Sequence, residues 1–182
     1  MEYIEKVSYQ VDKSNTIVEV SDDWIKAATV GQADDLTVKE KVIGRSILSY
    51  IVGEATKMYY QVVFGKCRRL GKEHTINYRC DSPSHKRFMQ MVIKPDTNES
   101  LNINNYLLRE EPFNNPVHIE ETTGNFRNPT QRCSICNKLK LSKTDDWKAP
   151  EELSKEESKE YIVIHTICPS CHGKDWRSNQ KN

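Results

Sequence analysis

The sequence predicts an α+β fold: a five-stranded antiparallel sheet with helices on one face, followed by a small, separate C-terminal module. Along residues 1–112, two strand-like segments come first, then a group of helices, then three more strand-like segments. Helices grouped between strands, rather than alternating with them, favour an antiparallel sheet covered on one face. The composition changes in residues 113–131, which are rich in Asn, Pro, Thr and Gly, and residues 132–182 hold four of the six cysteines. We therefore expect a domain at 1–112, a linker at 113–131 and a module at 132–182.

The chain begins with a predicted hairpin and a short helix. Residues 3–11 and 16–20 show the apolar alternation of strands and are separated by a short polar segment. Ser21 precedes two acidic residues, Asp22 and Asp23. A hydroxyl side chain followed by negative charge favours the start of a helix, where backbone N–H groups lack partners.

The clearest predicted helix covers residues 53–70, after a shorter one at 46–51. Its apolar residues recur at steps of three and four, so they share one face that we expect to pack on the sheet. These residues are Ala55, Met58, Tyr59, Val62, Val63, Cys67 and Leu70.

Three strands are expected after this helix, at residues 75–80, 87–94 and 101–108. The connectors 81–84 and 95–98 contain Pro, Asp and Ser or Asn, which favour turns. A sheet packed against the long helix would enclose a ligand pocket. We expect its lining to include Met58, Tyr59, Val62, Tyr78 and Met91.

Several short segments of this first part resemble PAS domains. The run VIGRSIL at 42–48 is similar to a stretch of that family, and DDW at 22–24 stands where PAS domains commonly begin the helix after their second strand. RCDSP at 79–83, followed by RFM at 87–89, is similar to a block of some bacterial PAS-like proteins. The resemblance spans about residues 5–110. It implies a sensory or interaction module that often dimerises and sometimes holds a small ligand.

Two cysteine pairs carry the strongest chemical signal. Cys133 and Cys136 form one C-x2-C pair, Cys168 and Cys171 form another, and 31 residues separate the pairs. Two such loops can supply the four tetrahedral ligands of a structural Zn(II) site. A redox pair and an iron–sulfur centre are the alternatives. We expect zinc with a closed ligand shell and no open coordination position, so we interpret the metal as structural and not catalytic.

The end of the chain carries a second resemblance. The segment HTICPSC at 165–171 resembles the HGICPxC ending that accompanies an upstream CxxC in some bacterial signalling proteins, with Thr166 in place of Gly. The resemblance implies a metal-binding appendage. His165 and His172 flank the second pair, and either could replace a cysteine as ligand. The long gap between the pairs predicts a helix at 150–160 and a strand at 161–164.

Charge and composition limit the function classes. The chain has 27 Lys and Arg against 26 Asp and Glu, so it lacks the positive field of a dedicated duplex-DNA binder. A nucleic-acid-binding zinc protein remains the alternative function, because basic residues surround the cysteine pairs. They are Lys138, Lys140, Lys143, Lys174 and Arg177.

No pattern in the sequence indicates catalysis, export or a membrane span. We find no Ser-His-Asp arrangement, no phosphate-binding glycine loop and no HExxH, so we do not expect an enzyme. The N-terminus does not resemble a signal peptide, and the longest apolar runs are far below the roughly 18 residues of a spanning helix. We expect a cytoplasmic regulatory protein that acts as a homodimer or through a signalling partner.

Overall fold

The computed structural model describes residues 3–30, 33–114, 119–121, 129–141, 145–153 and 161–177. The chain divides into two compact units. The first, here the sheet unit, consists of Met1–Val52, Tyr60–Asn77 and Met89–Arg109. The second, here the cysteine unit, consists of Gly53–Tyr59, Tyr78–Phe88 and Glu110–Asn182.

This division differs from the predicted domains at 1–112 and 132–182. The cysteine unit includes Gly53–Tyr59 and Tyr78–Phe88, which the sequence pattern assigns to the first domain. The predicted linker at 113–131 contains a strand, β6 (Ile119–Glu121), and the first two residues of another, β7 (Thr130–Cys133). Short strands that pair with distant segments have weak local sequence patterns. In a segment rich in Asn and Pro, such strands are not predicted from the sequence.

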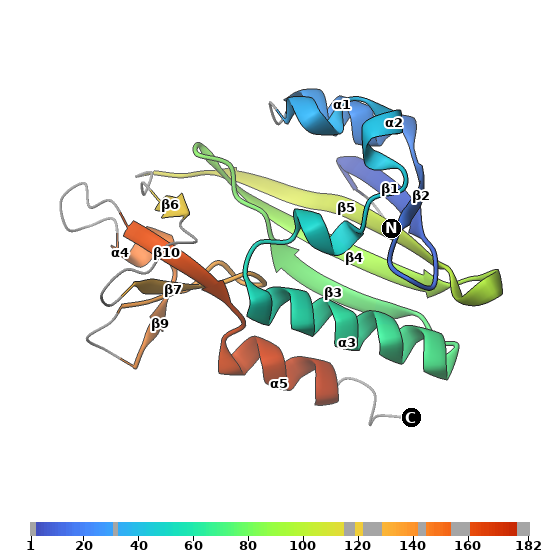
Figure 1. The fold of residues 1–182 in the computed structure, drawn as a ribbon. Helices are drawn as coiled ribbons and strands as arrows, with labels where there is room; N and C mark the ends of the chain where they lie inside the picture. The colour runs from blue at the N-terminus through green and yellow to red at the C-terminus, as the bar shows by residue number, and fades with distance from the viewer. Residues whose placement is uncertain are drawn as a thin grey trace. The chain divides into compact units, whose positions relative to one another are not determined.

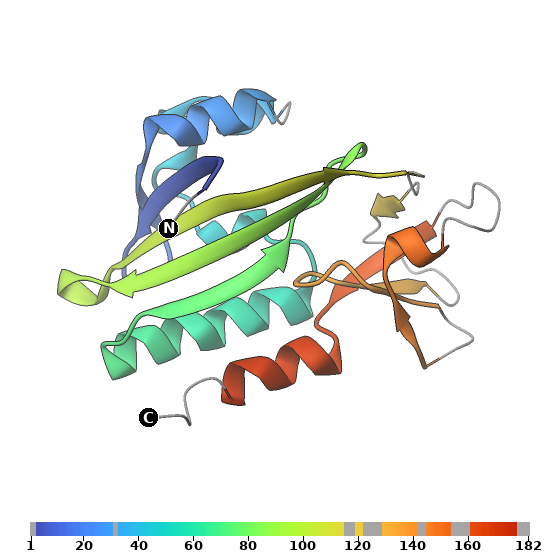
Figure 2. The ribbon, with the colours of Figure 1, turned by 180° about the vertical axis from the view of Figure 1, so that it is seen from behind.

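The first sheet has the predicted α+β character. Its five strands lie in the order β2-β1-β5-β4-β3 (Figure 2). Their bounds are β1 (Glu5–Val11), β2 (Ile17–Val20), β3 (His74–Arg79), β4 (His85–Pro95) and β5 (Leu101–Pro112). Strand β1 pairs antiparallel with β2, where Tyr9 faces Val20, and antiparallel with β5, where Val11 faces Leu101. The five-stranded antiparallel sheet is therefore confirmed.

Helical segments lie between β2 and β3, as predicted (Figure 1). They are α1 (Asp22–Val30), η1 (Asp34–Leu36), α2 (Lys39–Val42), η2 (Ile47–Tyr50) and α3 (Glu54–Leu70). The segment expected as a short helix at 46–51 is the 3-10 helix η2, whose start is capped by the Ser46 side chain. The core of the sheet unit is apolar and fully buried. It includes Val11, Ile17, Phe64, Ile93, Leu101 and Ile103.

The buried face of α3 matches the predicted stripe only in part. Val63 and Cys67 of that stripe are buried together with Tyr60 and Phe64, all at most 8% exposed, whereas Met58, Val62 and Leu70 are at least 50% exposed. Apolar residues occupy more than one face of this helix, so periodicity alone does not choose between faces. The face with two aromatic rings is the buried one, and aromatic side chains remove the most apolar area from water.

The predicted ligand pocket is wrong at two positions. Met58 is 63% exposed and Val62 is 60% exposed, because both lie on the opposite face of α3 from Tyr60 and Phe64. Met91 is buried, and Tyr59 and Tyr78 are half-buried. A pocket role for these three residues stays a prediction.

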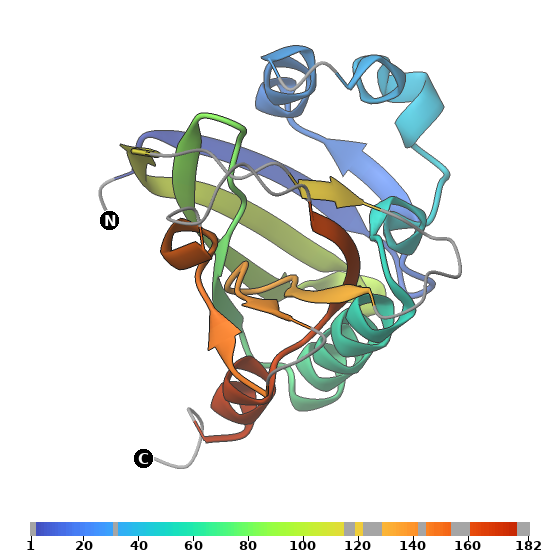
Figure 3. The same ribbon diagram turned by 90° about the vertical axis from the view of Figure 1, so that its left-hand side faces the viewer.

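The cysteine unit contains a second sheet in the order β6-β10-β7-β8-β9 (Figure 3). Strand β10 (Tyr161–Thr166) pairs parallel with both β6 and β7. Strands β7, β8 (Leu139–Lys140) and β9 (Trp147–Lys148) pair antiparallel. Two helices, α4 (Pro150–Leu153) and α5 (Pro169–Arg177), complete the described part of this unit. The predicted helix at 150–160 begins where expected, and its residues 154–160 lie outside the described residues.

In the part of the chain that the structure describes, no helix is long and apolar enough to cross a membrane.

Candidate metal centre

The first cysteine pair lies in the turn between β7 and β8. Cys133 is the last residue of β7, and its N–H donates to the Lys138 carbonyl oxygen at 2.9 Å. The N–H of Asn137 donates to the Cys133 carbonyl oxygen at 2.9 Å, which closes the loop around Cys136. Asn137 has a φ of 60°, a left-handed conformation that asparagine adopts more readily than most residues. The sequence Cys-Ser-Ile-Cys-Asn therefore suits a tight turn with two sulfur atoms.

The second pair lies where β10 ends and α5 begins. The N–H of Cys171 donates to the Cys168 carbonyl oxygen at 3.0 Å, so one helical turn joins the two cysteines. Strands β7 and β10 are parallel, and Cys133 pairs in register with Thr166. Because parallel strands end at the same edge of a sheet, this register brings the second pair beside the first.

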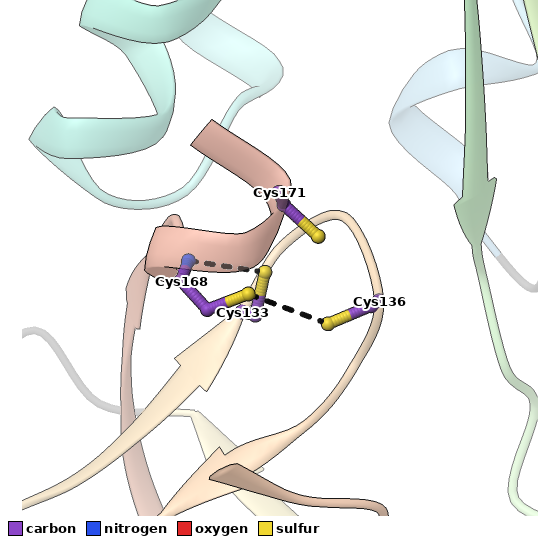
Figure 4. A group of neighbouring side chains, drawn as sticks. All are labelled: Cys133, Cys136, Cys168 and Cys171. Atoms are coloured by element: carbon purple, nitrogen blue, oxygen red, sulfur yellow. Dashed lines mark hydrogen bonds between the residues drawn. The ribbon is translucent and has the colours of Figure 1, made fainter. Parts of the chain in front are cut away.

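The four sulfur atoms form one compact group (Figure 4). All lie within 4.8 Å of one another, and the Sγ atoms of Cys136 and Cys168 are 3.8 Å apart. A tetrahedral ion with metal–sulfur bonds of about 2.3 Å places its sulfurs roughly 3.8 Å apart. A disulfide would place them at about 2.05 Å, and all six cysteines of the chain are free thiols. The group could therefore hold a metal ion.

Burial keeps the group away from water except at one ligand. Cys133 is 0%, Cys168 1% and Cys171 8% exposed, whereas Cys136 is half-buried. The backbone N–H of Cys168 donates to the Cys133 sulfur at 3.3 Å (Figure 4). A backbone donor of this kind stabilises a thiolate.

Hydrogen bonds among the sulfur atoms shift the pKa values of the cysteines in opposite directions. The pKa of Cys133 is lowered because the thiols of Cys136 and Cys171 donate hydrogen bonds to its sulfur. The hydrogen bond that each donates to Cys133 raises the pKa of Cys136 to about 11 and also raises the pKa of Cys171. One thiolate is thus favoured and its neighbours keep their protons. A bound divalent cation would supply the positive charge that lets all four ionise.

Neither predicted histidine belongs to the sulfur group. The Nδ1 atom of His165 lies 3.2 Å from the Ser134 hydroxyl, so this ring contacts the cysteine turn beside the sulfurs. His172 follows Cys171 in α5 and is exposed.

Three contacts around the group had no signal in the sequence. The Ser134 hydroxyl lies 2.8 Å from the hydroxyl of Thr56 in α3, and the Arg79 N–H donates to the Ile135 carbonyl oxygen at 2.8 Å. Arg79 also forms an ion pair with Glu151 of α4, at 3.0 Å. These partners are 56 to 78 positions apart in the chain, and no periodic pattern links residues at such a distance.

The structure describes the side chains of two of the five basic residues predicted near the cysteines. Lys140 pairs with Asp145 at 2.8 Å, and Lys138 is exposed. Lys143 lies outside the described residues, as do the side chains of Lys174 and Arg177. That alternative stays a prediction.

The fold and the site together define an α+β protein with a C-terminal four-cysteine group suited to a metal ion. No protein-family model matches the chain, and the comparison with curated proteins finds no significant relative.

Proposed function

We propose that Cys133, Cys136, Cys168 and Cys171 bind one structural Zn(II) ion. The observation that carries this proposal is the group of four sulfur atoms within 4.8 Å of one another. Four thiolates in a tetrahedral arrangement are typical of structural zinc, and the complete sulfur shell leaves no position for a substrate. We therefore propose a non-enzymatic role.

The ion would stabilise the fold of the cysteine unit. Its strands β8 and β9 have two residues each, and among its described residues the largest fully buried side chains are Cys133, Leu139, Val163 and Cys168. A small core of this kind gives little hydrophobic stabilisation. Zinc binding contributes about 10–16 kcal/mol in small zinc-binding peptides, so the metal would supply much of the folding free energy.

For the sheet unit we propose a PAS-like sensory role, through a bound ligand or a protein partner that includes a second copy of this chain. The support is the combination of a five-stranded antiparallel sheet, the helical segments between β2 and β3, and the VIGRSIL segment. Such a module would act by changing its conformational populations when it binds.

Metal content tests the zinc proposal directly. We expect native mass spectrometry and elemental analysis of the purified chain to give one zinc per chain. Cys133→Ser should lose the metal, whereas Cys80→Ser should keep it, since Cys80 is an exposed cysteine outside the group. Zinc-free protein, or equal zinc in the two variants, would refute the assignment.

The same native spectra test the sensory proposal. A retained small molecule or a dimer mass supports it. A ligand-free monomer that captures no small molecule from a metabolite library would count against it.

A further inference from the structure

The turn that holds the first cysteine pair also contacts two segments that are distant in sequence. Its two central residues, Ser134 and Ile135, make these contacts. The Ser134 hydroxyl lies 2.8 Å from the Thr56 hydroxyl, and the Ile135 carbonyl oxygen accepts a hydrogen bond from the Arg79 N–H at 2.8 Å. Thr56, Arg79 and the cysteine turn all belong to the cysteine unit.

The first contact fixes the start of α3. Thr56 is 3% exposed, so its hydroxyl needs an internal partner, and Ser134 provides one. Gly53, just before α3, has a φ of +86°, and a Cβ atom there would lie 2.7 Å from the Cβ of His165. His165 also lies 3.2 Å from the Ser134 hydroxyl. The start of α3 therefore packs closely against β10, the strand that leads to Cys168.

The second contact fixes the end of β3 and its turn into β4. Beyond the bond from Arg79 to Ile135, the Arg79 guanidinium binds the carboxylates of Asp81 and Glu151 at 2.7 and 3.0 Å. Asp81 also accepts a hydrogen bond from the Arg87 N–H at 3.1 Å. The segment Tyr78–Phe88 is thus tied to the cysteine turn by backbone and to α4 by charge.

We propose that the metal ion is itself the regulatory ligand of this protein, and that its occupancy sets the order of Gly53–Tyr59 and Tyr78–Phe88 through Ser134 and Ile135. This inference rests on the proposed zinc site. Cys133 and Cys136 hold the turn in one conformation when both bind the same ion. Without the ion, Ser134 and Ile135 lose their fixed positions, and Thr56 and the Arg79 N–H lose their partners.

The change would not end within the cysteine unit. Helix α3 and strands β3 and β4 each contribute residues to both units. If the ion orders one end of such an element, it also changes which conformations are available along the rest of that element. This is a physical basis for coupling.

The ligand class follows from the donor atoms. Thiolates select zinc and other soft or borderline ions, and not Mg²⁺ or Ca²⁺.

Hydrogen exchange of the intact chain, measured by mass spectrometry over a series of buffered free-zinc concentrations, tests the inference. We expect amides in 53–59 and 78–88 to exchange at least about tenfold more slowly with zinc, with the same midpoint as those in 130–141. Amides in β1 (Glu5–Val11), which lies wholly in the sheet unit, should change by less than about twofold, which shows that the chain has not unfolded globally. Zinc-dependent protection confined to 130–141 would overturn the inference.

Two variants examine the coupling without relying on the metal-free chain. Cys136→Ser, which leaves three sulfurs, should move the midpoints of all three segments together to higher free zinc. Thr56→Val should keep its zinc and lose most of the zinc-dependent protection at 53–59. The matched control is Thr75→Val, the same substitution at an exposed position of β3, which should exchange like the unaltered chain.

The outcomes separate the two proposals. A chain that binds no zinc refutes the proposed function and the inference together. A chain that binds one zinc, with unchanged exchange in 53–59 and 78–88, refutes the inference alone. Full zinc-dependent protection at 53–59 in Thr56→Val would refute the route through Ser134.

Discussion

The guanidinium of Arg79 and the carboxylate of Asp81 form a two-bonded ion pair, with Nε 3.1 Å from Oδ1 and Nη2 2.7 Å from Oδ2. Their side chains are only 12% and 8% exposed, and the guanidinium also lies 5.6 Å from the centre of the Phe88 ring. Arg79 is the last residue of β3 and Asp81 lies in the turn that follows, so the pair fixes the end of the strand to its turn.

Removing one partner of this pair should destabilise the protein measurably. We expect Asp81→Asn to lower the free energy of unfolding by about 2 kcal/mol, because a shielded guanidinium loses a charged partner and Glu151 compensates only in part. The matched control is Asp23→Asn, whose pair with Lys26 has side chains 50% and 74% exposed. Urea unfolding should show a change of less than about 0.5 kcal/mol for the control. Equal losses of unfolding free energy in the two variants would contradict the claim that burial makes the Arg79–Asp81 pair the stronger one.

Two glycines, one just before α3 and one within it, should respond in opposite directions to alanine. Gly53 has a φ of +86°, and an added Cβ would lie 2.7 Å from the Cβ and 2.9 Å from the carbonyl oxygen of His165. We expect Gly53→Ala to cost roughly 1–3 kcal/mol. Gly65 lies within α3 with nothing near an added Cβ. Gly65→Ala should therefore stabilise by about 0.5–1 kcal/mol, read from thermal unfolding.

Adjacent valines in α3 report which face of the helix is buried. Val63 is 5% exposed and Val62 is 60% exposed. Val63→Ala should cost about 1–3 kcal/mol, because it removes buried methyl groups and leaves a cavity. Val62→Ala should change the free energy of unfolding by less than about 0.5 kcal/mol. The reverse order in chemical denaturation would contradict the assignment of Val63 to the buried face.

Thiol reactivity should separate the two cysteines outside the metal group. Burial raises the pKa of Cys67 to about 11, and its side chain is 2% exposed. Since the thiolate is the nucleophile, Cys67 should resist a maleimide at pH 8 in the native zinc-loaded chain, while the exposed Cys80 is labelled. Peptide mass spectrometry gives the labelled positions. Rapid labelling of Cys67 would show that this part of α3 opens readily.

The raised pKa of Cys67 also predicts how stability depends on pH. The folded chain holds the Cys67 proton more tightly than the unfolded chain does. The contribution of this thiol to the free energy of unfolding is therefore fully present below pH 9. It declines as pH rises from about 9 to about 11, where the folded thiol ionises. Cys67→Ala should remove this part of the alkaline decline, measured by unfolding at pH 8 and pH 10.

Sequence patterns alone determined the order of strands and long helix in residues 3–112 and the four cysteines of the candidate metal group. The order of two strands, helices and three strands was predictable because apolar periodicity, capping residues and turn residues act over a few positions. The spacing of Cys133 with Cys136, and of Cys168 with Cys171, was informative for the same reason: each pair is a local turn.

Only the tertiary structure decided which face of α3 is buried and where the units divide. Both faces of α3 carry apolar side chains, and the choice of Tyr60 and Phe64 over Met58 and Val62 depends on what the helix packs against. Likewise, no local pattern brings Thr56 to Ser134 or Arg79 to Ile135. These contacts form because strand register and chain closure place distant segments together, and a sequence encodes such placement only through its whole packed core.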